Sequence, residues 1–171
     1  YISSAEKKVL INNPTFDVLS TTPKLSTEKL VKILKESIPT TSKNHEITYE
    51  KVDGIDDIIP EHYILKVNKI SIISIYKTQA CHNFNTIKEN NKTIKIATID
   101  TMLSFYLAFI YTNKPYYNPE RILCIAEYLF KVQARNRFKQ TGVLKRFTAK
   151  CYGKQDTLQN IRAEKANTVS Y

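Results

Sequence analysis

The sequence predicts an α+β fold, with a small, mostly antiparallel sheet packed on a buried central helix and on a second helix. Three observations support this prediction. Short runs rich in β-branched and aromatic residues lie between residues 47 and 76. A nearly continuous apolar stretch follows at 98–110, and a second periodic apolar stretch begins near Pro119. With 42% hydrophobic residues in 171, the chain can bury a core, which distinguishes it from a disordered basic tail.

The N-terminal part contains one predicted helix, from Leu25 to Ser37. Ser26 is placed to cap it, and Leu30, Ile33 and Leu34 recur at the spacing of one helical face. Prolines on either side mark its limits, and a polar loop follows. We therefore divide the chain into an N-terminal segment, 1–45, and an α+β domain, 46–171, whose C-terminal segment 131–155 is basic.

The predicted sheet is built from strands in the middle of the chain. Ile47–Val52 alternates apolar and polar residues, as a half-buried strand does. His62–Val67 and Ile70–Tyr76 are separated by Asn68-Lys69, a two-residue connection typical of a β-hairpin, because Asn tolerates positive φ. Lys92–Ile96 is a further short strand.

The apolar stretch after residue 97 predicts the central helix. Thr98 is a suitable N-cap and Asp100 suits the first turn. Because apolar residues occupy most sides of this helix, we expect Leu103 and Leu107 to be buried. Pro119 is a favourable first-turn residue for the second helix, which we expect to cover one side of the sheet.

The positive charge is concentrated near the C-terminus. Residues 114–154 contain ten basic and two acidic side chains, which accounts for a charge of +8 out of +10 for the whole chain. Residues 135–155 contain no acidic side chain. The candidate binding residues of this part of the chain are Arg135, Arg137, Lys139, Lys145, Arg146, Lys150, Tyr152 and Lys154.

Three interpretations of this basic segment compete. Surface lysines on a solvated face are common, and a membrane-surface helix would need a clean apolar face, which residues 135–155 do not have. The third is a path for single-stranded nucleic acid, in which phosphates meet the basic side chains and bases stack on aromatic ones. The interleaved Phe138, Phe147 and Tyr152 favour this third interpretation. Phe138 and Phe147 are also candidates for the core, so Tyr152 is the better stacking candidate.

The cysteines and histidines do not predict a metal site. Cys81, Cys124 and Cys151 lie far apart without a CxxC pair, which indicates reduced thiols in a reducing compartment. Cys81-His82 could be half of a metal site, but no zinc-ligand spacing accompanies it. The longest apolar run, around residues 102–111, is too short to cross a bilayer.

The sequence contains no recognisable catalytic constellation. Neither GxxxxGK[ST] nor GxGxxG occurs, and no proposed strand carries two carboxylates at i and i+2, the spacing that would let them hold two metal ions together. Asp53, Asp56 and Asp57 lie in a predicted loop, where turn formation and solvation explain them. We therefore predict neither catalytic residues nor metal ligands in this chain.

Several stretches resemble one enzyme family. KIATIDTMLSFYLAFIY, RILCIAEYLF, FTAKCYGKQDTLQNIRAEK and YILKVNKISIISIYKTQACHNFN are similar to the C-terminal part of the catalytic subunits of viral poly(A) polymerases. The relevant enzymes are those of large nucleocytoplasmic DNA viruses, such as giant amoebal viruses and African swine fever virus, which are distantly related to the poxvirus enzyme. The resemblance covers roughly residues 46–165.

The resemblance implies a C-terminal, non-catalytic domain of a nucleotidyltransferase-type enzyme that adds adenylate units to mRNA 3′ ends. The parent would use ATP with Mg²⁺ or Mn²⁺, held by an earlier domain whose motifs are absent here. The implied partners are single-stranded RNA or the poly(A) tail, the catalytic domain of the same polypeptide, and a second copy or a processivity subunit. No membrane is implied, and the location would be the viral factory in the host cytoplasm, and the virion.

Two further expectations concern the parent. The only methionine is Met102 and the chain begins at Tyr1, so we expect a fragment, a processed product or a trimmed chain of a longer protein. The alternative function is a non-enzymatic basic protein that binds nucleic acid or packs it into virions.

Overall fold

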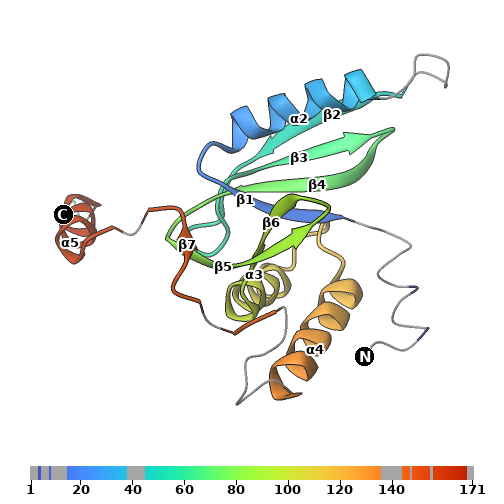
Figure 1. Cartoon of the computed structure of the whole chain (residues 1–171). Helices are drawn as coiled ribbons and strands as arrows, with labels where there is room; N and C mark the ends of the chain where they lie inside the picture. The colour runs from blue at the N-terminus through green and yellow to red at the C-terminus, as the bar shows by residue number, and fades with distance from the viewer. Residues whose placement is uncertain are drawn as a thin grey trace.

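The computed structural model describes residues 15–37, 45–135, 144–146, 148–154 and 156–168, besides Ser4 and Lys8. Over these residues it has an α+β fold (Figure 1). The helices are α2 (Pro23–Ser37), α3 (Ile99–Thr112), α4 (Pro119–Arg135) and α5 (Leu158–Thr168). The strands are β1 (Phe16–Ser20), β2 (Ile47–Val52), β3 (His62–Val67), β4 (Ile70–Lys77), β5 (His82–Glu89), β6 (Lys92–Ala97) and β7 (Cys151–Tyr152).

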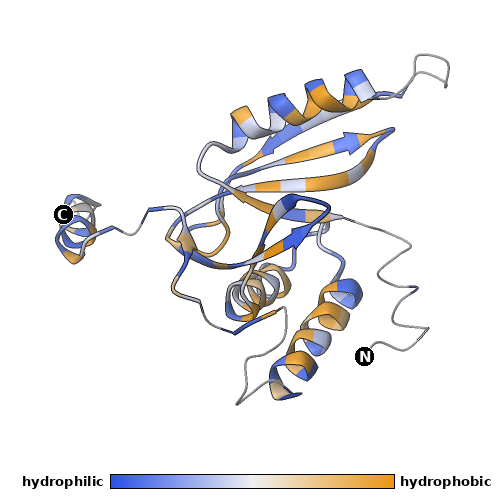
Figure 2. Ribbon diagram, viewed as in Figure 1, coloured by the Kyte–Doolittle hydropathy of each residue, from blue (hydrophilic) through white to orange (hydrophobic). Residues whose placement is uncertain are grey.

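The larger sheet has the strand order β1-β4-β3-β2. The predicted strands β2, β3 and β4 are confirmed and pair antiparallel. Asn68 and Lys69, at the predicted hairpin connection, have φ angles of 50° and 68°, the positive values that a type I′ turn requires. Figure 2 shows that apolar residues predominate along β3 and β4, the two central strands of this sheet.

The edge strand β1 was not expected from the sequence. It pairs parallel with β4, with Phe16 opposite Ile73 and Ser20 opposite Lys77. A parallel pair needs a long connection, and α2 together with the β2–β3 meander provides it. The chain before residue 46 therefore contributes an edge strand and a helix to a sheet completed by later residues.

A second, smaller sheet has the order β6-β5-β7. The strand predicted at 92–96 is confirmed as β6, and its partner β5 was not predicted. Asn90 and Asn91 connect the two strands, and both have positive φ, as a tight hairpin turn requires. This sheet lies beside β1 and close to α3 (Figure 1).

Helix α2 covers the face of the larger sheet opposite to α3 and α4 (Figure 1). It begins at Pro23 rather than at Leu25, so Pro23 is its first residue and Ser26 is not its N-cap. Instead the Ser26 and Ser20 hydroxyls hydrogen-bond at 2.8 Å. Ile33 is exposed, so only part of the predicted apolar face of this helix packs on the sheet.

The core between the larger sheet and α3 is aromatic. Tyr76 of β4 and Phe109 of α3 are buried, with ring centroids 5.3 Å apart, and Ile59 and Ile122 complete the cluster. A second cluster joins α3 to α4 through Ile99, Leu103, Ala126 and Leu129. The expected N-cap is confirmed, since Thr98 Oγ1 accepts from the Thr101 N–H.

One expectation about these helices was wrong. Leu107 is 49% exposed, although Leu103 is buried as predicted. Helix α4 packs against α3 and reaches the larger sheet through Ile122, which lies in the same cluster as Tyr76 of β4. Leu107 is exposed because α3 has the sheet on one side and α4 on another, which leaves a third side to solvent. No helix in the described part of the chain is long and apolar enough to span a membrane.

Candidate nucleic-acid interface

Part of the basic segment is docked along β5. The Lys150 carbonyl accepts from the Phe84 N–H at 3.1 Å, and the Thr148 hydroxyl donates to the Phe84 carbonyl at 2.9 Å. The Asn83 side chain donates to the Thr148 carbonyl at 2.6 Å. Because the backbone of this segment is bound to the strand, its basic side chains are left to project from the surface. We call residues 144–146 and 148–154 the docked basic segment.

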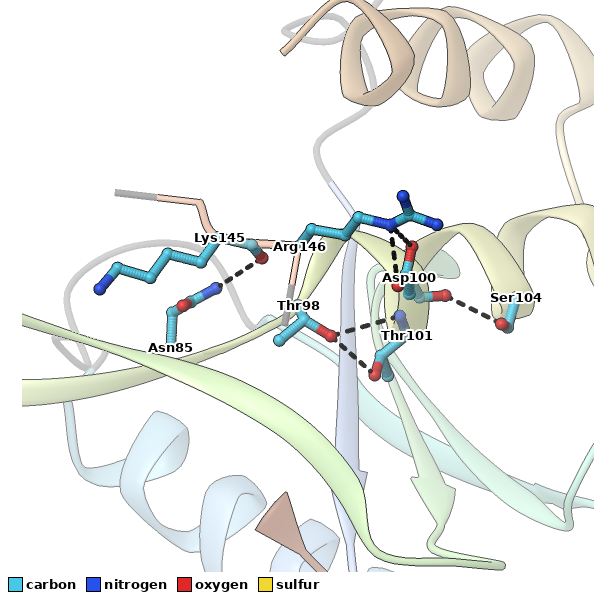
Figure 3. Close-up of polar contacts among 7 residues, drawn as sticks. All are labelled: Asn85, Thr98, Asp100, Thr101, Ser104, Lys145 and Arg146. Atoms are coloured by element: carbon cyan, nitrogen blue, oxygen red, sulfur yellow. Dashed lines mark hydrogen bonds and ion pairs between the residues drawn. The ribbon is translucent and has the colours of Figure 1, made fainter. Parts of the chain in front are cut away.

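The segment also contacts the N-terminus of α3 (Figure 3). The Lys145 carbonyl accepts from the Ile99 N–H at 3.4 Å and from the Asn85 side chain at 3.3 Å. The Arg146 guanidinium lies 3.3 Å from the Asp100 carboxylate (Nε–Oδ1). These contacts satisfy backbone and charged groups at a helix start that would otherwise lack partners.

A disulfide holds the other end of the segment, between Cys81 and Cys151 with their Cα atoms 5.2 Å apart. The expectation of three reduced thiols was therefore wrong. The spacing of 70 residues gave no signal, because only the pairing of β7 with β5 brings the two cysteines together. Gly153 follows with φ +112°, and a Cβ there would clash with the Ala80 carbonyl.

The predicted RNA-contacting residues fall into three groups. Lys145, Lys150 and Lys154 are exposed on the docked basic segment. Arg146 shares it but is paired with Asp100, and Arg135 lies at the end of α4. Arg137 and Lys139 lie outside the described residues, as do Phe138 and Phe147, which were considered for stacking or for the core.

Tyr152 is half-buried and joins the two sheets. Its hydroxyl accepts from the Thr21 N–H at 3.4 Å, just after β1. Hydrogen bonds from Thr21 hold the pKa of Tyr152 below its ordinary value, since they stabilise the phenolate. The Lys95 ammonium lies 5.5 Å from the centroid of the Tyr152 ring and 4.9 Å from that of Phe84, within the range of cation–π attraction.

Two cavities lie between β1 and the smaller sheet, with volumes of about 420 Å³ and 300 Å³. We call them together the β1–β6 cleft. Both are lined by Asp17, Val18, Leu19, Lys95 and Ala97. The larger one extends over α3, and the smaller one reaches Tyr152 and His82. Sequence reasoning missed Lys95 and Asp17, although each is a charged residue among apolar neighbours on a strand, which is a detectable signal.

Asp17 is the most electrostatically perturbed acid near this cleft. Desolvation raises its pKa to about 6, although the nearby Arg121 charge and a hydrogen bond from Tyr106 oppose the rise. The residue is exposed on the edge strand, so solvent reduces the energetic effect of this desolvation. The same environment raises the pKa of Tyr106 to about 12, mainly by burial.

The described residues do not fit the metal ion that a nucleotidyltransferase would use. Among them, no group of three or more His, Cys, Asp or Glu side chains is arranged to hold a metal ion. Cys81, half of the metal pair considered from the sequence, is in the disulfide.

The fold resembles one part of a longer solved chain. A crystal structure of the Megavirus polyadenylate synthase matches with a TM-score of 0.64 and 14% sequence identity. The match covers 95% of this chain and 35% of that chain, so the protein spans about a third of the length of the structure it resembles. No protein-family model and no curated protein matches the sequence.

Proposed function

We propose that this chain is the C-terminal, non-catalytic part of a viral polynucleotide adenylyltransferase and that it supplies an RNA-facing surface. The observation that carries the proposal is the docked basic segment, which presents exposed Lys145, Lys150 and Lys154 from a backbone bound to β5. The fold likeness to a polyadenylate synthase supports the enzyme class. A different domain of the parent would hold ATP and Mg²⁺ or Mn²⁺.

The chemistry of this surface suits an enzyme that extends RNA of any sequence. Lysines contact phosphates as point charges and do not read bases. A fixed backbone lowers the entropy lost when the lysines meet the phosphates, because only side-chain freedom remains to be restricted. We expect single-stranded RNA or the growing poly(A) tail as ligand, in the host cytoplasm or the virion.

The test compares two triple variants of equal charge. Lys145→Gln/Lys150→Gln/Lys154→Gln neutralises the docked basic segment, whereas Lys29→Gln/Lys32→Gln/Lys35→Gln neutralises exposed lysines on α2, on the far side of the sheet. Binding of oligo(A) and oligo(U) is measured by fluorescence anisotropy between about 50 and 200 mM salt. The segment variant should bind oligo(A) and oligo(U) more weakly, by about the same factor. It should also lower the slope of log K against log salt by about 2, roughly 0.7 for each lost phosphate contact.

The α2 variant should keep most of the salt dependence of RNA binding, measured as the slope of log K against log salt. Equal losses in the two variants would mean that only net charge matters, and unchanged binding in the segment variant would reject the RNA-facing surface. The chain alone should not add adenylate to RNA with ATP and Mg²⁺. Incorporation by the isolated chain would contradict its assignment as a non-catalytic part.

A further inference from the structure

The β1–β6 cleft is lined by strand edges rather than by strand faces. β1 is the edge strand of the larger sheet and β6 is the edge strand of the smaller one. Consecutive residues of each strand, 16–19 and 94–97, line the same cavity, although side chains alternate between faces along a strand. An edge strand carries backbone N–H and C=O groups that no neighbouring strand satisfies. The walls therefore offer hydrogen-bond donors and acceptors to a ligand.

The floor of the cleft is apolar and aromatic. Met102, Phe105 and Phe109 of α3 line the larger cavity beneath the two strands. Its volume of about 420 Å³ lies in the range of about 300–1,000 Å³ that is typical of small-molecule sites. A ligand with flat apolar surfaces and a polar edge would satisfy both the floor and the walls.

Among the described residues that line the cleft, one is a cation, Lys95. Among the described residues, Lys95 has only the two ring contacts and no carboxylate partner. A lysine held over aromatic rings keeps its charge available to an anion. Asp17, on the opposite wall, can exchange a proton near neutral pH and can therefore accept or donate a hydrogen bond.

The cleft is continuous with the docked basic segment. Tyr152 belongs to that segment and lines the smaller cavity, which shares Lys95 with the larger one. Lys150 lies two residues before Tyr152 and is exposed. A phosphate backbone that follows the segment therefore passes the mouth of the cleft.

We propose that the β1–β6 cleft binds an unstacked nucleobase of the RNA that follows the docked basic segment, with Lys95 contacting the adjoining phosphate. The base places its faces on the α3 floor and its polar edge against the strand edges. That this base belongs to an RNA strand rests on the proposed function. The same base-and-phosphate chemistry also occurs in a free nucleotide, so the experiment includes both.

The probes are an RNA oligomer containing 2-aminopurine, the same oligomer with an abasic site at that position, and AMP. Lys95→Gln removes the cation, and Lys92→Gln removes an equal charge from the same strand outside the cleft. Ala97→Phe fills the cleft, and Thr93→Phe adds the same ring at an exposed position of β6. Thermal unfolding checks that each variant folds. If Ala97→Phe does not fold, Lys95→Gln and its control Lys92→Gln still test the cleft.

We expect binding to change the fluorescence of 2-aminopurine and the abasic oligomer to bind about tenfold more weakly, within the roughly 1–3 kcal/mol of one stacked base. Ala97→Phe should remove most of this difference, and Thr93→Phe should keep it. Lys95→Gln should weaken binding of both oligomers more than Lys92→Gln does, because the abasic oligomer keeps its phosphates. If the abasic oligomer binds as tightly as the intact one, the cleft does not bind a base, and if Lys95→Gln matches Lys92→Gln, Lys95 does not contact the adjoining phosphate.

The outcomes also separate the cleft from the proposed function. Loss of RNA binding in the lysine triple variant together with normal binding in Lys95→Gln and Ala97→Phe would reject the cleft and retain the surface. Binding of AMP that depends on Lys95 and Ala97, without RNA binding, would identify a free nucleotide as the ligand and reject the RNA-facing surface. If the wild type binds RNA and both the lysine triple variant and the cleft variants bind it more weakly, the RNA-facing surface and the base-binding cleft are both supported.

Discussion

Arg146 and Asp100 form an ion pair between the docked basic segment and the first turn of α3, with Nε 3.3 Å from Oδ1 and 3.4 Å from Oδ2. Both side chains are partly exposed, so the pair contributes less than about 1 kcal/mol to stability. Its greater effect is on the surface potential, since Asp100 places a negative charge within a surface that we propose binds RNA.

Asp100→Asn should therefore raise affinity for single-stranded RNA, by a factor of about two to five at about 50 mM salt, corresponding to less than about 1 kcal/mol. Anisotropy titration measures this, and Glu36→Gln on α2 removes the same charge from an exposed site as a control. Arg146→Gln should have the opposite effect. Weaker RNA binding by Asp100→Asn would indicate that the pair positions the segment rather than competing with RNA.

Phe109 should dominate the stability of the larger core. Its ring lies 4.3 Å from that of Tyr117 and 5.3 Å from that of Tyr76, centroid to centroid, and the residue is 2% exposed. Phe109→Ala should lower the free energy of unfolding by about 3–5 kcal/mol, from lost burial and the cavity left behind. Tyr111→Ala, in the same helix at 78% exposure, should change it by less than about 0.5 kcal/mol. Urea denaturation measures both, and similar effects would mean that α3 is oriented differently.

Local patterns predicted the strands and helices that carry a clear periodicity. The Asn68-Lys69 connection and the Thr98 cap were both readable, because their conformations depend on neighbouring residues. β1 was missed because its pairing partner β4 lies more than 50 residues away and its own alternation is weak. β5 was missed because His82–Glu89 is mostly polar, and its side chains serve the docked basic segment as much as the core.

The candidate site was only partly predictable for the same reason. Charge counting found the basic segment directly from composition. The disulfide and the β1–β6 cleft depend on contacts between distant residues, such as His82 opposite Tyr152, and no local spacing encodes them. A sequence window around Lys95 shows a lysine on a short strand and gives no indication that β1 lies across from it.

Stability should depend on pH through Asp17. Its pKa is raised to about 6 from 3.8, so between these values the folded state binds the proton more tightly than the unfolded state does. The contribution is fully present below pH about 4 and is lost as the pH rises through about 6. Relative to Asp17→Asn, the free energy of unfolding of the wild type should fall by on the order of 1 kcal/mol between these pH values. This is less than the full pKa shift would give, because β1 is exposed to solvent.

Urea denaturation of both proteins at several pH values between about 4 and 7 tests this directly. NMR titration of the Asp17 carboxyl carbon provides a second measurement, with an expected midpoint of about 6. A midpoint near 4, together with a constant difference between the two proteins, would mean that the carboxyl group is well solvated.

The disulfide between Cys81 and Cys151 should stabilise the fold and hold the docked basic segment in place. It joins residues 70 positions apart, and closing a loop of this size typically contributes about 2–4 kcal/mol. Cys81→Ser/Cys151→Ser should lower the free energy of unfolding by that amount. Cys124→Ala, at a cysteine outside the disulfide, should cost less.

Thiol titration under denaturing conditions checks the bond itself. Of the three cysteines, one should react before reduction and all three after it. In hydrogen exchange, the Phe84 amide should lose protection in the double serine variant, since its N–H donates to the Lys150 carbonyl of the segment. Three reactive thiols before reduction would show that the bond is absent. In that case backbone hydrogen bonds and the Arg146–Asp100 pair would hold the segment on β5, and the serine variant should bind RNA like the wild type.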